Sequence, residues 1–91
     1  MSAEIRGLVI YGYPQCPFCA RVQRAVDALG LEVELRNTLS SPRDQRELVE
    51  AMGRTTVPVL RIEFEDGRFE WLPESADIID YLEEFAERDG F

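Results

Sequence analysis

The motif Cys-Pro-Phe-Cys at residues 16–19 lies where a predicted strand is followed by a predicted helix. This junction constrains the fold of the 91-residue chain more than any other stretch. Before the junction, Leu8–Tyr11 is a continuous apolar run between two glycines, which indicates a strand buried on both faces of a sheet. After it, apolar residues recur at helical spacing and predict a helix of about three turns. The apolar face of that helix comprises Phe18, Val22, Ala25, Val26 and Leu29.

Cys16 lies at the expected N-terminus of this helix, where a thiolate is stabilised. A helix N-terminus carries unpaired N–H groups and about half a positive charge, so it favours an anion. Pro17 suits the first helical position, because its missing N–H would have had no partner there. Cysteines in Cys-x-x-Cys pairs titrate about one to five units below the free value of about 8.5. We expect Cys16 to be the exposed attacking thiol and Cys19, one turn later, to be the shielded resolving thiol.

The two cysteines could instead bind a metal or form a structural disulfide. A closed zinc site needs four ligands, and the chain has two cysteines and no histidine, so no metal is expected. A disulfide across so short a loop would remove little chain entropy. Redox chemistry is therefore the better interpretation of a Cys-x-x-Cys pair between a strand and a helix.

The charge of the chain excludes one large class of partner. Eighteen acidic residues against ten basic ones give a formal net charge of −8, and every basic residue is an arginine. Nucleic acid is not an expected partner, because phosphate binding needs clustered basic side chains. The sequence shows no signal peptide and no apolar run near the ~18 residues of a membrane span. We expect one domain over residues 1–91, a monomer without membrane contact, in the reducing cytoplasm.

The segment from residue 30 to residue 53 predicts a second strand and a second helix. Gly30 ends the first helix. Leu31–Arg36 alternates apolar and charged residues, which indicates a half-buried strand, far enough along the chain to pair in parallel with the first. Ser41 is expected to cap a surface helix that ends at Gly53. The apolar stripe of this helix is short and consists of Leu48, Val49 and Met52.

The remaining third of the chain predicts a hairpin and a last helix. The two predicted strands of the hairpin are Val59–Phe64 and Arg68–Trp71. A two-residue turn of the primed type at Asp66-Gly67 is expected to join them. Phe69 and Trp71 are expected to point together into the core. The last helix opens at Pro73-Glu74-Ser75 with Gly90 as its expected stop, and its apolar face comprises Ser75, Ile78, Ile79, Leu82, Phe85 and Ala86.

Three motifs in this order resemble the glutaredoxins, a family with the thioredoxin fold. They are Cys-Pro-Phe-Cys at the junction, Thr56-Val57-Pro58 before the third strand, and a helix after the hairpin. The stretch Trp71–Ile79 looks like the glutathione-transferase-like branch of bacterial glutaredoxins and the N-terminal domains of glutathione transferases. The resemblance implies an α/β fold of order β-α-β-α-β-β-α, with a four-stranded mixed sheet and helices on both faces. It also implies a cis Val57–Pro58 bond.

The resemblance further implies a glutathione-dependent dithiol oxidoreductase that reduces mixed or protein disulfides, with glutathione as co-substrate. Val57 would pair with the glutathione peptide through its backbone, Glu74 would bind the ammonium group, and Ser75 would bind the γ-glutamyl carboxylate. For Ser75, a plain N-cap is the alternative role. The full set of expected glutathione-binding residues is Tyr13, Gln15, Pro17, Phe18, Thr56, Val57, Pro58, Glu74 and Ser75.

The chain departs from the family pattern in two respects. No lysine precedes the first cysteine, so the helix terminus, Pro17, or an arginine such as Arg21 or Arg54 must activate Cys16. The helical second domain of the transferases is not in this sequence, which argues against a complete transferase. Two alternatives stay open. One is a glutathione-binding module or carrier of an iron–sulfur cluster shared between two chains, and the other is a disulfide reductase coupled to a thioredoxin-type reductase.

Overall fold

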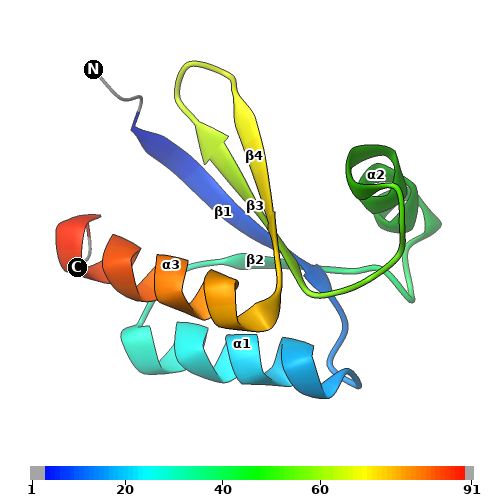
Figure 1. Ribbon diagram of the computed structural model, residues 1–91, viewed down its shortest axis with the longest axis horizontal. Coiled ribbons are helices and arrows are strands. Elements are labelled where there is room, and N and C mark those ends of the chain that lie inside the picture. Colours follow the sequence, from blue (N-terminus) through cyan, green and yellow to red (C-terminus); the bar gives the residue numbers. More distant parts are fainter. Residues whose placement is uncertain (1–3, 90–91) are drawn as a thin grey trace.

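The computed structural model describes residues 4–89 and shows a four-stranded sheet with helices on both faces (Figure 1). The order of elements is the predicted one, so the thioredoxin-like α/β fold is confirmed. No helix among these residues is long and apolar enough to cross a bilayer. The elements are β1 (Ile5–Gly12), α1 (Pro17–Leu29), β2 (Glu34–Asn37), α2 (Pro42–Met52), β3 (Val59–Phe64), β4 (Phe69–Pro73) and α3 (Ser75–Asp89).

The sheet has the strand order β2-β1-β3-β4, which places β1 and β3 at its centre. β1 pairs in parallel with β2 and antiparallel with β3, and β4 returns antiparallel to β3. The parallel pair follows from the α1 crossover, while the hairpin supplies the antiparallel pair. Helices cover both faces of the sheet over β1, which explains the continuous apolar run of this strand.

Successive side chains of β1 point to opposite faces of the sheet and enter two separate cores. Leu8 and Ile10 lie in the larger core, beneath α1 and α3, which run side by side on that face (Figure 1). Val9 and Tyr11 lie in the smaller core, where Leu48 of α2 covers the other face. The two helices on one face and the single helix on the other thus share one central strand.

The predicted helix boundaries are confirmed by their caps. Cys16 is the extended N-cap residue of α1, and Gly30 ends that helix in the left-handed region with φ 68°. The Ser41 hydroxyl accepts a hydrogen bond from the Asp44 N–H at 3.3 Å, as expected of a cap at the start of α2. Gly53 ends α2 with φ 75°. The expected stop of the last helix at Gly90 lies outside the described residues.

The second strand is shorter and later than predicted. It spans Glu34–Asn37 rather than Leu31–Arg36. The alternation nevertheless gives the correct face, because Leu31 is buried and Val33 packs against the larger core. Leu35 is 41% exposed because β2 is an edge strand that α1 covers incompletely.

The predicted two-residue turn is wrong. The Phe64 carbonyl accepts from the Gly67 N–H at 3.0 Å, and the Phe64 N–H donates to the Arg68 carbonyl at 3.0 Å. The loop therefore has three residues, Glu65 to Gly67, and Gly67 alone has a positive φ, 92°. This is a turn followed by a left-handed glycine, the usual three-residue hairpin connection.

Three residues of the predicted apolar faces are exposed. Phe18 is 58% exposed, because the buried stripe of α1 starts one residue later, at Cys19. Val49 is 38% exposed because α2 contacts the sheet through the adjacent Leu48. Phe69 is 50% exposed on the edge strand β4, where it packs on the guanidinium of Arg61 rather than in a core.

Candidate active site

The first cysteine occupies the turn between β1 and α1. The Cys16 N–H donates to the Tyr13 carbonyl at 3.2 Å, and the Cys16 carbonyl accepts the first helical bond from the Ala20 N–H at 2.9 Å. The Cys16 side chain makes no capping hydrogen bond and is partly exposed. Its sulfur can therefore meet a second molecule while its backbone holds the helix terminus.

The helix terminus explains the acidity of Cys16. Partial burial raises the pKa of the Cys16 thiol, but the backbone N–H groups of Cys19 and Phe18 and the thiol of Cys19 favour the thiolate and outweigh the effect of burial. The net result is a pKa below the ordinary value of a cysteine. Neither Arg21 nor Arg54 contributes to this shift. Of the sources that the sequence left open, the first turn of α1, including its second cysteine, is the one that this shift supports.

Cys19 has the opposite environment. The residue is 5% exposed, and this burial, together with the neighbouring Cys16, raises its pKa to about 11. Both cysteines are free thiols. The predicted division into an accessible thiol and a shielded thiol is thus present in the structure.

Gly12 is a site residue that sequence reasoning treated only as the end of a strand. A Cβ at this position would lie 2.6 Å from Cys19 Sγ, closer than packing allows. The last residue of β1 must therefore lack a side chain, so that the buried sulfur can pack directly on the strand backbone. The available signal for this role was a glycine four residues before the first cysteine of the Cys-x-x-Cys motif.

A pocket of about 190 Å³ lies between the start of α1, the end of α2 and the start of α3. It brings together six of the nine residues expected to bind glutathione. The Val57–Pro58 bond at its edge is cis, as predicted. Sequence reasoning missed four lining residues. One of them, Arg54, was considered only as a group that could activate Cys16. The expected six are Phe18, Thr56, Val57, Pro58, Glu74 and Ser75, and the missed four are Met52, Arg54, Val59 and Pro73.

Three expected residues lie outside this pocket. Gln15 and Pro17 are exposed on the turn and the first position of α1. Tyr13 lines a separate groove with Cys19 and Leu35. Among residues 4–89, no group of three or more His, Cys, Asp or Glu side chains is placed to bind a metal ion.

The start of α3 differs from the simplest prediction. The Glu74 carbonyl accepts the first helical bond from the Ile78 N–H at 3.0 Å, so Glu74 holds the capping position and Ser75 is the first helical residue. The alternative role of Ser75 as a plain N-cap is therefore wrong. Glu74 has φ 75°, in the left-handed region that few non-glycine residues adopt. Both residues line the pocket.

Replacement of Gly12 by alanine should disturb the cysteine pair. We expect Gly12→Ala to lower the free energy of unfolding by about 1–3 kcal/mol, because the new methyl group overpacks against Cys19 Sγ. Gly7→Ala is the matched control on the same strand, since its Cβ would meet nothing closer than 3.8 Å. Urea denaturation of both variants measures the difference, and equal losses would contradict the proposed contact.

The acidity of Cys16 should depend on what occupies position 19. We expect iodoacetamide to alkylate Cys16 with a midpoint below the free-thiol value of about 8.5. Cys19→Ser retains a hydrogen-bond donor and should leave the midpoint nearly unchanged. Cys19→Ala removes the donor and should raise the midpoint by about one unit. Identical profiles for the two variants would assign the acidity to the backbone N–H groups alone.

Comparison with known proteins identifies the family. Residues 10–89 match the family described as the glutathione S-transferase N-terminal domain, and no curated protein sequence matches the chain. Maleylacetoacetate isomerase from Anaeromyxobacter dehalogenans, solved with dicarboxyethyl glutathione and citrate in its active site, matches with TM-score 0.69 and 29% identity over 96% of this chain. Glutaredoxin 2 from Salmonella typhimurium, solved with glutathione, matches with TM-score 0.68 and 29% identity over 87% of this chain.

The matching structures are longer proteins. This chain spans 40% of the isomerase and 34% of glutaredoxin 2. A glutathione transferase family member from Pseudomonas fluorescens matches with TM-score 0.70 over 90% of this chain and 37% of its own, and at 20% identity it supports the fold alone. The family match over residues 10–89 and the observed fold agree. The chain belongs to the glutathione S-transferase N-terminal domain family.

Proposed function

We propose that this protein is a glutathione-dependent dithiol oxidoreductase that reduces mixed disulfides and protein disulfides in the cytoplasm. The observation that carries the proposal is the unequal pair of thiols at the N-terminus of α1. Cys16 is partly exposed with a lowered pKa, while Cys19 is buried with a pKa of about 11. Because the thiolate is the nucleophile, this difference supports attack by Cys16 and resolution by Cys19.

The pocket beside the start of α1 offers groups that match the charges of glutathione. Glutathione carries two carboxylates, one ammonium group and an extended peptide. Glu74 suits the ammonium group, and Ser75 with the N–H groups at the start of α3 suits the γ-glutamyl carboxylate. Val57 offers its backbone to the peptide, and Arg54 offers a cation to the glycyl carboxylate. Because exposed charges are screened beyond about 8 Å, Arg54 can offset the net charge of −8 locally.

The proposed reaction consists of exchanges at sulfur. The Cys16 thiolate attacks the glutathione sulfur of a mixed disulfide, a Cys16–glutathione disulfide forms, and the substrate thiolate leaves and takes a proton from solvent. A second glutathione thiolate then attacks the glutathione sulfur of this intermediate. Glutathione disulfide is released, and Cys16 returns to its thiolate form. In the alternative second step, deprotonated Cys19 attacks the Cys16 sulfur, which releases reduced glutathione and leaves a Cys16–Cys19 disulfide.

Single cysteine variants test the reaction directly. We expect Cys16→Ser to lose about a hundredfold or more of the rate of reduction of a glutathione–mercaptoethanol mixed disulfide, because serine is not ionised at neutral pH. Cys19→Ser should retain most of that rate, since a second glutathione can complete the cycle. The measurement is glutathione disulfide formation coupled to glutathione reductase and NADPH. A Cys16→Ser variant with the wild-type rate would overturn the mechanism, and wild-type protein that binds glutathione without turnover would support the binding-module alternative.

Arg54 should affect substrate binding and leave the chemical step unchanged. We expect Arg54→Gln to raise the KM for glutathione by about threefold to tenfold with little change in kcat, because it removes one charge-assisted contact at an exposed site. Arg46→Gln on α2 makes the same change of charge outside this pocket and serves as the control. Equal effects of the two substitutions would show that net charge, rather than contact with Arg54, governs the KM.

A further inference from the structure

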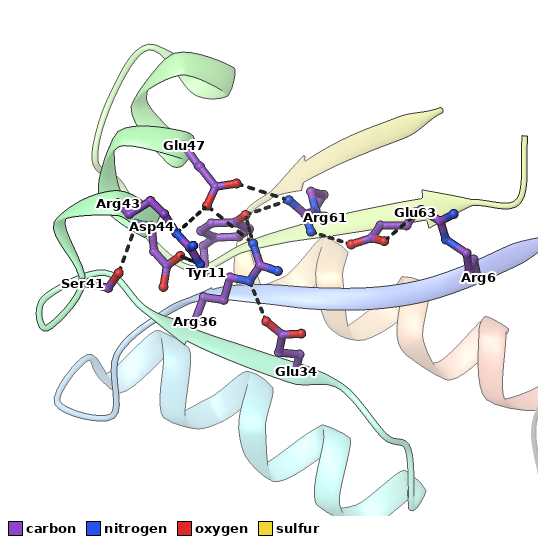
Figure 2. Close-up of polar contacts among 10 residues, drawn as sticks. All are labelled: Arg6, Tyr11, Glu34, Arg36, Ser41, Arg43, Asp44, Glu47, Arg61 and Glu63. Atoms are coloured by element: carbon purple, nitrogen blue, oxygen red, sulfur yellow. Dashed lines mark hydrogen bonds and ion pairs between the residues drawn. The ribbon is translucent and has the colours of Figure 1, made fainter. Parts of the chain in front are cut away.

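A cluster of charged side chains surrounds a buried tyrosine on the α2 face of the sheet (Figure 2). Tyr11 is fully buried, and its hydroxyl accepts hydrogen bonds from Arg61 Nη1 at 2.9 Å and Arg36 Nη1 at 3.1 Å. Arg61 is itself only 8% exposed. We call the residues Tyr11, Arg36, Glu47, Arg61 and Glu63 the polar cluster.

Arg61 needs this cluster because its charge is removed from water. Its guanidinium pairs with Glu63 on the same strand and lies 5.1–5.7 Å from three aromatic ring centroids. Those rings belong to Tyr11, Phe69 and Trp71. Its Nε has no hydrogen-bond partner among residues 4–89. A buried charge with incomplete hydrogen bonding depends strongly on each remaining partner.

Glu47 is the member of the polar cluster that belongs to α2. Its Oε1 lies 3.5 Å from Arg36 Nη1, and its Oε2 lies 3.7 Å from Arg61 Nη1. The two arginines belong to β2 and β3, the strands on either side of β1. One carboxylate thus connects α2 with two strands at once, as Figure 2 shows.

The other attachment of α2 to the sheet is small. Leu48 is the apolar residue of α2 that is fully buried, and Met52 packs only partly against the smaller core. Beside the buried Leu48 and Asp44, the ion pairs of Glu47 with two strands further constrain the orientation of α2. Met52 ends α2 and Arg54 follows two residues later, and both line the pocket proposed for glutathione.

We propose that Glu47 is a positioning residue for glutathione, because its ion pairs with Arg36 and Arg61 fix the part of the pocket formed by Met52 and Arg54. Glu47 does not line the pocket itself. This inference rests on the proposed glutathione pocket but not on turnover, so it can be tested separately from catalysis.

The test measures glutathione binding by calorimetry in the full chain with Cys16→Ser, a background in which turnover does not interfere. Adding Glu47→Gln should weaken the binding of reduced glutathione by about fivefold, a loss typical of partly exposed ion pairs. Net charge alone predicts the opposite sign, since the variant is less negative and glutathione is anionic. Glu50→Gln, an exposed position on α2 with no ion pair among residues 4–89, makes the same change of charge and should not weaken binding.

A second variant tests whether the effect passes through the ion pairs. Arg36→Gln should also weaken binding, and the double variant with Glu47→Gln should lose less than the two single losses combined. Circular dichroism checks that each variant remains folded. A Glu47→Gln variant that melts at a lower temperature but binds glutathione as tightly as its parent would overturn the inference.

The outcomes also separate this inference from the proposed function. If the wild-type protein reduces no disulfide but Glu47→Gln weakens glutathione binding, the proposed function is overturned and the positioning role is supported. Wild-type turnover with equal binding by Glu47→Gln and its parent would overturn the positioning role alone. A parent that binds no glutathione would overturn both.

Discussion

The packing of Cys19 Sγ directly on the backbone of Gly12 is the contact on which the site depends. It brings the first turn of α1 against the end of the central strand, with no side chain between them. Cys19 is buried as a result, and its N–H and thiol are in place to hydrogen-bond Cys16. One missing side chain on the strand thereby produces two chemically different thiols on the helix.

Most of the fold could be predicted from the sequence, because its signals are local. The continuous apolar run of β1, the caps at Cys16 and Ser41 and the left-handed glycines after α1 and α2 each act within a few residues. Where a residue's position depends on a distant partner, prediction failed. Phe69 alternates correctly along its strand, but Arg61 rather than a core covers it. Alternation in sequence predicts a face of the sheet but not what lies above that face.

The candidate site shows the same limit. The motif at residues 16–19 predicts which cysteine is accessible, because a helix N-terminus has a known polarity. The pocket, however, combines residues from the starts of α1 and α3, the end of α2 and the loop before β3. Arg54 enters it only because α2 crosses the opposite face of the sheet and ends nearby. The positive φ of Glu74 could not be predicted either, since no sequence rule assigns a glutamate to the left-handed region.

In the proposed reaction, the burial of Cys19 would also affect how fast each disulfide of Cys16 is reopened. In a disulfide between Cys16 and Cys19, an incoming thiolate would attack the more exposed Cys16 sulfur, so Cys19 would be the leaving group. A thiol with a pKa of about 11 is a poor leaving group. In a disulfide between Cys16 and an external thiol, Cys16 can depart instead, and its lowered pKa makes it a good leaving group. If the proposed reaction forms both disulfides, the burial of a single sulfur atom would make the internal one slower to reopen than the external one.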